Sequence, residues 1–287
     1  MNRRANKVGT PVLYSIGMRL IIPALFIAVL SGSFIHSSSA ISSVEQLVPE
    51  STQALVVEET SAPVLSARAY GVFDVETGEI LLSYNADQSL SIASVTKLFT
   101  AAAALKSEKL EEEVMVISSD VAAEGRSGKL EVGQLYHLRE LLFPLLLESS
   151  NDAAEVFNRT LDKVPFADKF LADSSGLSSQ NKATVNELAY EVRQVYLEEP
   201  YIFDITKLKQ HIGKYTGWIN NSPVQSLPGY QGGKHGYTEA ANRTLVAIFS
   251  ESSLGDRKLG YIILGSDNLL ADTKELRAVV ASSVHLE

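Results

Sequence analysis

Ser94-Val95-Thr96-Lys97 opens an apolar stretch that runs from Leu98 to Leu105. The stretch has helical character, so Ser94 and Lys97 lie one turn apart on one face of a helix. A serine hydroxyl needs an adjacent base to become a nucleophile, and a lysine can be that base if its surroundings lower its pKa. The first helical turn also leaves backbone N–H groups free to hold an oxyanion. The tetrapeptide can therefore supply a nucleophile, a base and half of an oxyanion hole.

Two further motifs follow in the chain, and each also has a purely structural interpretation. Ser149-x-Asn151 marks a break between two helical runs, where it can present a hydroxyl and an amide to a cleft or simply cap a helix. Lys234-x-Gly236 starts a strand. It can offer a positive charge and backbone donors to a substrate, or it can be an ordinary strand start. A second Ser-x-x-Lys, at 179–182, lies in a loop, so only the ordered set is informative.

The hydrophobic patterns predict strands at both ends of the folded region and helices between them. Residues 95–215 are mostly helical in pattern, a final helix is expected at 272–283, and strands are expected at 67–74, 79–84, 233–238, 244–250 and 258–264. We therefore expect an α+β fold, an α/β sandwich whose antiparallel sheet, built from N- and C-terminal segments, is flanked by helices. A mainly helical lobe is inserted, and the cleft between sheet and lobe is the expected site.

Composition excludes several classes of function. The 287 residues are 45% hydrophobic and carry a net charge of −9. Because residues 1–40 contribute +4 to that total, the remaining residues carry −13, which argues against a nucleic-acid partner. The chain has no cysteine, and its five histidines are not spaced as metal ligands on a helix. No metal or organic cofactor is expected.

The N-terminus has the features of an export signal. Basic residues precede an apolar core at 20–30, and small residues follow up to Ala40. We expect residues 1–40 to be a signal peptide or an N-terminal membrane anchor, and 41–65 to be a linker before a domain at 66–287. The protein is then exported to the periplasm, the cell surface or the outer face of the cytoplasmic membrane, and contacts the membrane only through this segment.

Taken in order, the three motifs resemble those of penicillin-binding proteins and serine β-lactamases. The resemblance is strongest to the D-alanyl-D-alanine carboxypeptidases and covers roughly 66–280. It is carried by four segments, at 93–100, 149–154, 173–177 and 183–184. It implies a β-lactamase/transpeptidase-like fold for 66–287, a monomer that acts as a serine D,D-peptidase on peptidoglycan stem peptides, and β-lactam antibiotics as covalent inhibitors.

The resemblance also implies roles for the motif residues. Ser94 attacks the carbonyl between two D-alanines and forms an acyl-enzyme, and Lys97 takes its proton. Ser149 relays a proton to the leaving amine while Lys234 sets the local field, and Asn151 holds a substrate amide. The oxyanion lies between the backbone N–H groups of Ser94 and the residue after Gly236. The expected substrate-binding residues on the strand are His235, Gly236, Tyr237 and Thr238.

His235 is a departure from the family, which usually has Thr or Ser at this place to bind the terminal carboxylate. One hypothesis is that protonated His235 still binds the carboxylate, so that activity falls from about pH 6 to 8. A second is that carboxylate recognition is weakened and the enzyme is a D,D-endopeptidase on cross-links. A third is that the substitution has little effect.

Two alternatives to a D,D-peptidase remain at this stage. A class A β-lactamase needs a deacylating glutamate in a loop, whereas Glu187 and Glu191 lie in a helical run. A non-catalytic peptidoglycan-binding relative is suggested by His235, although every other motif residue is present. Acylation by a β-lactam distinguishes this relative from the enzymes.

Overall fold

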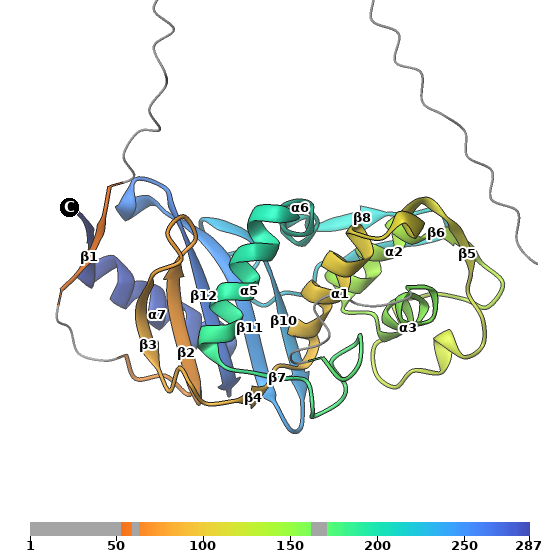
Figure 1. Ribbon diagram of the computed structural model, residues 1–287, viewed down its shortest axis with the longest axis horizontal. Helices are drawn as coiled ribbons and strands as arrows, with labels where there is room; N and C mark the ends of the chain where they lie inside the picture. Colours follow the sequence, from red (N-terminus) through yellow and green to blue (C-terminus); the bar gives the residue numbers. More distant parts are fainter. Residues whose placement is uncertain (1–52, 59–62, 162–170) are drawn as a thin grey trace, which may run out of the picture. The chain divides into compact units, whose positions relative to one another are not determined.

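Five strands form one antiparallel sheet, in the order β10-β11-β12-β2-β3, in the computed structural model of the chain (Figure 1). The structure describes residues 53–58, 63–161 and 171–287. The five strands are β2 (Ala69–Asp74), β3 (Ile80–Tyr84), β10 (Tyr230–Thr238), β11 (Asn242–Glu251) and β12 (Arg257–Ser266). Segments from before and after the helical middle therefore build one sheet, which confirms the predicted fold class.

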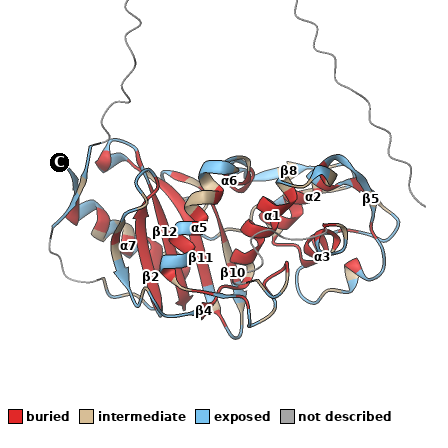
Figure 2. Ribbon diagram, in the orientation of Figure 1, coloured by how far each residue is buried: buried red, intermediate tan, exposed pale blue. Residues whose placement is uncertain are grey.

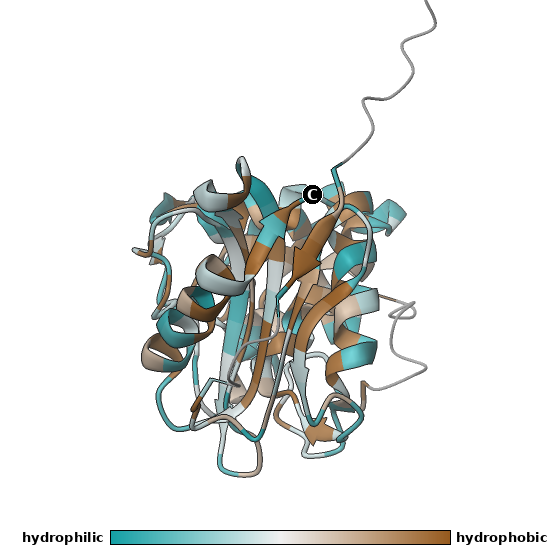
Figure 3. Ribbon diagram, turned by 90° about the vertical axis from the view of Figure 1, so that its left-hand side faces the viewer, coloured by the Kyte–Doolittle hydropathy of each residue, from teal (hydrophilic) through white to brown (hydrophobic). Residues whose placement is uncertain are grey.

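The sheet is buried on both faces because helices cover each side. Along β12, Tyr261 and Ile263 belong to one apolar core, and Ile262 belongs to the other. Helix α7 (Leu269–Ser283) closes the first core, and α1 (Thr96–Leu105) and α5 (Val185–Glu198) close the second. Each fully buried aliphatic side chain contributes about 1.5–3 kcal/mol. Figure 2 shows the buried strands, and Figure 3 shows them between helices on both sides.

Helix α1, which follows Ser94, is mostly apolar, is buried on all sides and lies in the middle of the second core. Nine of its ten residues are buried, and even Lys97 is fully covered. A helix that is hydrophobic all round is stable only when other elements surround it. Helices α2 (Leu138–Phe143) and α3 (Asn151–Thr160) pack around it. The position of Lys97 is thus determined by the core and not by the surface.

The leucine-rich run at 135–147 is less uniform than its sequence pattern predicts. It begins in the strand β6 (Leu135–His137) and continues as α2, which ends at Pro144. Proline lacks the N–H that an α-helix requires, so the chain widens into a π-helical turn, η4 (Pro144–Glu148). This turn delivers Ser149 to the cleft.

Shorter elements complete the fold, and two hairpins interrupt the predicted helical middle. Helix α5 starts with a capping box between Thr184 and Glu187, and α7 begins at Leu269, three residues before its predicted start. The 3-10 turns are η1 (Ala93–Val95), η2 (Glu108–Glu111), η3 (Asp120–Ala122) and η5 (Ser252–Leu254). The remaining helix and strands are α6 (Tyr201–Lys207), β4 (Leu90–Ser91), β7 (Lys182–Ala183), β5 (Glu113–Met115), β8 (Gln210–Ile212) and β9 (Gly217–Ile219).

The described elements include a strand that lies before the expected domain boundary at 66. Strand β1 (Leu55–Val57), inside the segment expected to be a linker, pairs with the C-terminal β13 (Val284–Leu286). Leu55 also packs against the core under α7, which accounts for this pairing. The expected signal or anchor at 1–40 lies outside the described residues. Among the described helices, none is long and apolar enough to cross a bilayer.

Candidate active site

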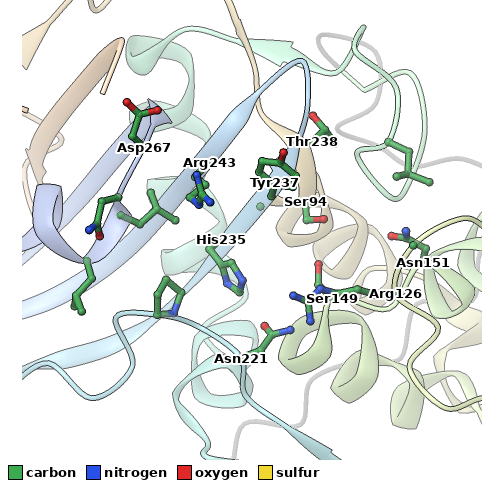
Figure 4. A pocket seen from close by; sticks show the side chains of 17 residues that line it. Ser94, Arg126, Ser149, Asn151, Asn221, His235, Tyr237, Thr238, Arg243 and Asp267 are labelled. Atoms are coloured by element: carbon green, nitrogen blue, oxygen red, sulfur yellow. The ribbon is translucent and has the colours of Figure 1, made fainter. Parts of the chain in front are cut away.

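The edge strand β10 lies against the turn η1, and a cavity of about 700 Å³ opens where they meet the helical lobe. Figure 4 shows the side chains around it. Seven of the predicted site residues line the cavity: Ser94, Ser149, Asn151, His235, Gly236, Tyr237 and Thr238. The other two, Lys97 and Lys234, are buried beneath it. The three sequence motifs therefore meet at one place.

Lys97 is placed as a base for Ser94. Its Nζ lies 3.2 Å from Ser94 Oγ and donates hydrogen bonds to Asn151 Oδ1 at 2.8 Å and to the Ser175 carbonyl at 2.6 Å. Burial is the main cause that lowers the Lys97 pKa, to about 7, and the Arg126 charge adds to it against the opposing charge of Asp173. A lysine with this pKa is neutral in half of the molecules near neutral pH and can accept a proton.

Two residues at the cavity hold left-handed backbone conformations that non-glycine residues rarely adopt. Ala93, directly before the nucleophile, has φ +47°, and Ser149 has φ +64°. Such conformations cost on the order of 1–3 kcal/mol each and persist only when the surrounding structure imposes them. Both occur where a helical element starts or ends at the site, so the fold holds Ser94 and Ser149 in place against a local conformational preference.

The loop after α3 supports Lys97 from the other side. The Asp173 carboxylate accepts hydrogen bonds from the backbone N–H groups of Ser175, Gly176 and the next two residues. Burial alone would raise the Asp173 pKa, but these hydrogen bonds outweigh it and lower the pKa. They also hold the loop in a tight turn, in which the Ser175 carbonyl accepts a hydrogen bond from Lys97. This loop belongs to the family-like segment at 173–177, but none of the three motifs marks Asp173.

The side-chain amide of Asn151 is hydrogen-bonded within the protein. Its Oδ1 accepts from Lys97, and its Nδ2 donates to the Glu124 carbonyl at 2.5 Å. Both ends of the side-chain amide therefore have partners, and its clearest role is to position Lys97. The expected contact with a substrate amide stays a prediction.

Lys234 and His235 both have unusually low affinities for a proton. Lys234 is buried, its Nζ donates to the His235 carbonyl at 2.7 Å, and burial, followed by the charges of Lys97 and Arg126, holds its pKa well below the usual range. Burial, followed by the charges of Lys234 and Arg126, likewise holds the pKa of the half-buried His235 well below its usual value. This direction disfavours the hypothesis that a protonated His235 binds the carboxylate, and the role of His235 stays a prediction.

Gly236 brings the strand into contact with the nucleophile's backbone. A Cβ atom at this position would lie 2.5 Å from the Ser94 nitrogen, which real structures do not tolerate. Tyr237 points outward, where the Arg243 guanidinium lies 5.4 Å from its ring centroid, and the Thr238 hydroxyl accepts from Ala241 N–H in the following turn. The oxyanion position at Ser94 and Tyr237 stays a prediction.

The sequence motifs miss several cavity residues. Apart from Leu177, which ends the family-like segment at 173–177, no motif marks them, because they lie in loops or near the ends of elements. They are Gly125, Arg126, Leu177, Asn221, Pro223, Arg243, Asp267, Asn268, Leu269 and Leu270. Within 53–58, 63–161 and 171–287, no three His, Asp or Glu side chains converge as metal ligands.

Glu187, one of the two glutamates considered as a deacylating base, lies outside the cavity. Its carboxylate accepts from the Thr184 hydroxyl and N–H in the capping box of α5, and it does not line the cavity. This placement disfavours a class A β-lactamase.

Comparisons with known proteins agree with the motifs. The chain is 24% identical to D-alanyl-D-alanine carboxypeptidase DacC of Escherichia coli, over 74% of this chain and 60% of that protein. It is 27% identical to D-alanyl-D-alanine carboxypeptidase DacB2 of Mycobacterium tuberculosis, over 67% of this chain and 72% of the relative. The fold is similar to that of penicillin-binding protein D2 of Listeria monocytogenes in its ampicillin-bound form, with a TM-score of 0.67, 23% identity and coverage of 77% and 99%.

The chain thus spans less than two thirds of the length of the Escherichia coli relative. The family description of D-alanyl-D-alanine carboxypeptidases matches residues 56–268, which is most of the chain and includes every residue of the three motifs. On this match, and on the way the motifs meet in one cavity, the chain belongs to the D-alanyl-D-alanine carboxypeptidase family, the S11 peptidases.

Proposed function

We propose that this protein is a serine D-alanyl-D-alanine carboxypeptidase that acts on peptidoglycan stem peptides and is inhibited by β-lactams. The observation that carries the proposal is the pair of Ser94 and Lys97, with Oγ and Nζ 3.2 Å apart at the cavity and a Lys97 pKa of about 7. A serine beside a neutral lysine is an activated nucleophile. Family membership supports the substrate class.

The reaction follows from this geometry in two steps. Ser94 Oγ attacks the carbonyl carbon between the two D-alanines while Lys97 Nζ takes the hydroxyl proton. The C–N bond then breaks. Ser149 Oγ gives its proton to the leaving amine, and the proton that Lys97 Nζ took from Ser94 replaces it on Ser149. Water hydrolyses the ester, its hydroxyl going to the acyl group and its proton returning to Ser94. Lys234 sets the potential around Ser149, and His235, Gly236, Tyr237 and Thr238 form the wall along which the peptide binds.

Labelling with a fluorescent penicillin tests the proposal. The wild-type protein is expected to form a covalent adduct, and Ser94→Ala is expected to form none. Ser179→Ala is the matched control, because Ser179 and Lys182 form the second Ser-x-x-Lys but lie outside the cavity. A folded wild-type protein that is not labelled would favour the non-catalytic peptidoglycan-binding relative.

The substrate is tested separately with a free pentapeptide and a cross-linked dimer. Release of D-alanine from the pentapeptide supports the carboxypeptidase, and cleavage of the dimer alone supports the D,D-endopeptidase.

Because peptidoglycan lies outside the cytoplasmic membrane, we also propose that the protein is exported, with residues 1–40 as its signal or anchor. Measuring the mass of the mature protein shows whether the N-terminal segment is removed. An uncleaved protein that is found soluble in the cytoplasm would contradict the proposed export.

A further inference from the structure

The guanidinium of Arg126 is an uncompensated positive charge at the rim of the cavity. Arg126 lines the cavity with Ser149 and His235, and Figure 4 shows its side chain reaching past Ser149 toward His235. Among the residues that the structure describes, no hydrogen bond or ion pair reaches this guanidinium. The planar donor fork of an arginine matches a carboxylate with two parallel hydrogen bonds. The cavity thus presents an anion-binding group whose partner is not among the residues that the structure describes.

The loop that carries Arg126 is attached to the first turn of α3. The backbone N–H of Asn151 donates to the Arg126 carbonyl at 2.7 Å, and its side chain donates to the Glu124 carbonyl. The Ser150 hydroxyl donates to the Ser127 carbonyl at 2.8 Å. These bonds fix the loop to the residues that directly follow Ser149. Arg126 therefore has a defined backbone position relative to Ser149, as a preorganised binding group requires.

The charges around Arg126 favour an anionic ligand on its side of the cavity. The positive charge of Arg126 lowers the pKa values of Lys97, Lys234 and His235, so it acts on all three basic groups. Of the described residues that line the cavity, only Asp267 is acidic, and Figure 4 places it on the far side from Arg126. No carboxylate of the described cavity lining therefore lies beside this guanidinium.

We propose that Arg126 binds the carboxylate of the leaving residue and so selects peptides whose leaving residue ends in a free carboxylate. The inference rests on the proposed function, in which Ser149 passes a proton to the leaving amine and thereby marks the leaving-group side of the cavity. In a leaving D-alanine, one carbon atom separates the carboxylate from the amine. A guanidinium that reaches past Ser149 lies where that carboxylate must be.

Two peptides that differ only in their last group test the inference. One ends in D-alanyl-D-alanine with a free carboxylate, and the other ends in D-alaninamide. The wild-type protein is expected to cleave the acid with a kcat/KM at least about tenfold higher than the amide. Arg126→Gln is expected to lose about tenfold on the acid and less than about twofold on the amide. Arg126→Lys, which keeps the charge without the fork, is expected to fall between them.

Arg139→Gln is the matched control, since Arg139 is exposed, pairs with Glu111 and does not line the cavity. It should leave both rates unchanged. Equal losses of Arg126→Gln on acid and amide would overturn the inference, because Arg126 would then act on the catalytic groups. A wild-type protein that is labelled by penicillin but cleaves both peptides equally would overturn the inference alone. Absence of labelling would overturn the proposed function itself.

Discussion

The protonation state of Lys97 sets the pH dependence expected for the reaction. Lys97 must be neutral to accept the Ser94 proton, and its pKa is about 7. The rate of Ser94 acylation by a labelled penicillin should therefore rise between pH 6 and 8, with a midpoint near 7. Glu155 opposes the lowering of this pKa through its negative charge, so Glu155→Gln should move the midpoint to lower pH. A rate that falls over this range would contradict the assignment of Lys97 as the base.

Gly236 is predicted to tolerate no side chain, because its Cβ would meet the Ser94 nitrogen and would lie 2.9 Å from Ala93 Cβ. Gly236→Ala must move the strand or the nucleophile, and a shift of about 1 Å costs about 100-fold in rate. Gly217→Ala is the control, since its Cβ would meet mainly the flexible end of Ile212, away from the cavity. Acylation rates and thermal midpoints of both variants check the prediction. An active Gly236→Ala protein would show that this contact is not needed.

Helix α3 contains a carboxylate that makes the stability of the fold depend on pH. Asp152 is buried, and neither of its oxygens has a hydrogen-bond partner among the described residues. Burial, and then the charge of Asp120, raises its pKa to about 6. The folded state thus holds the proton more tightly than the unfolded state. The resulting cost is absent below about pH 4, grows as the pH rises and reaches roughly 3 kcal/mol above pH 7.

Asp152→Asn should therefore be more stable than the wild type at pH 7.5 and differ little from it at pH 4.5. Denaturant unfolding at the two pH values measures the difference. Asp204→Asn, in an exposed first-turn position of α6, should show no such dependence. Equal pH dependence of wild type and Asp152→Asn would refute the proposed role of this carboxylate.

Helices and strands were predictable from the sequence where the chain has a regular pattern. They were not predictable where a contact with a distant part of the chain determines the local structure. The strands β2, β3, β10, β11 and β12 lie where turn residues separate short strand-like runs. The turn η4 depends on Pro144, and β1 pairs with the edge of β13, about 230 residues away in the chain. Local propensity contains no information on such a partner.

At the scale of the whole molecule, the order of the three motifs was enough to predict that they meet, because one sheet built from both ends leaves a single arrangement of the lobe. The same reasoning did not find Arg126, whose place depends on hydrogen bonds between its loop and Asn151. The low pKa of His235 was not predictable either, since burial beside Lys234 is a property of the fold and not of the tripeptide.

The pairing of β1 with β13 has a consequence for engineering. Glu287 N–H donates to the Ala54 carbonyl at 2.9 Å, so position 287 and the start of β1 are adjacent. A short peptide can join them, and new termini can be opened at the exposed turn at 214–215 between β8 and β9. Such a circular permutant keeps every contact of the cavity, and its reactive serine follows Lys234 in the rearranged chain.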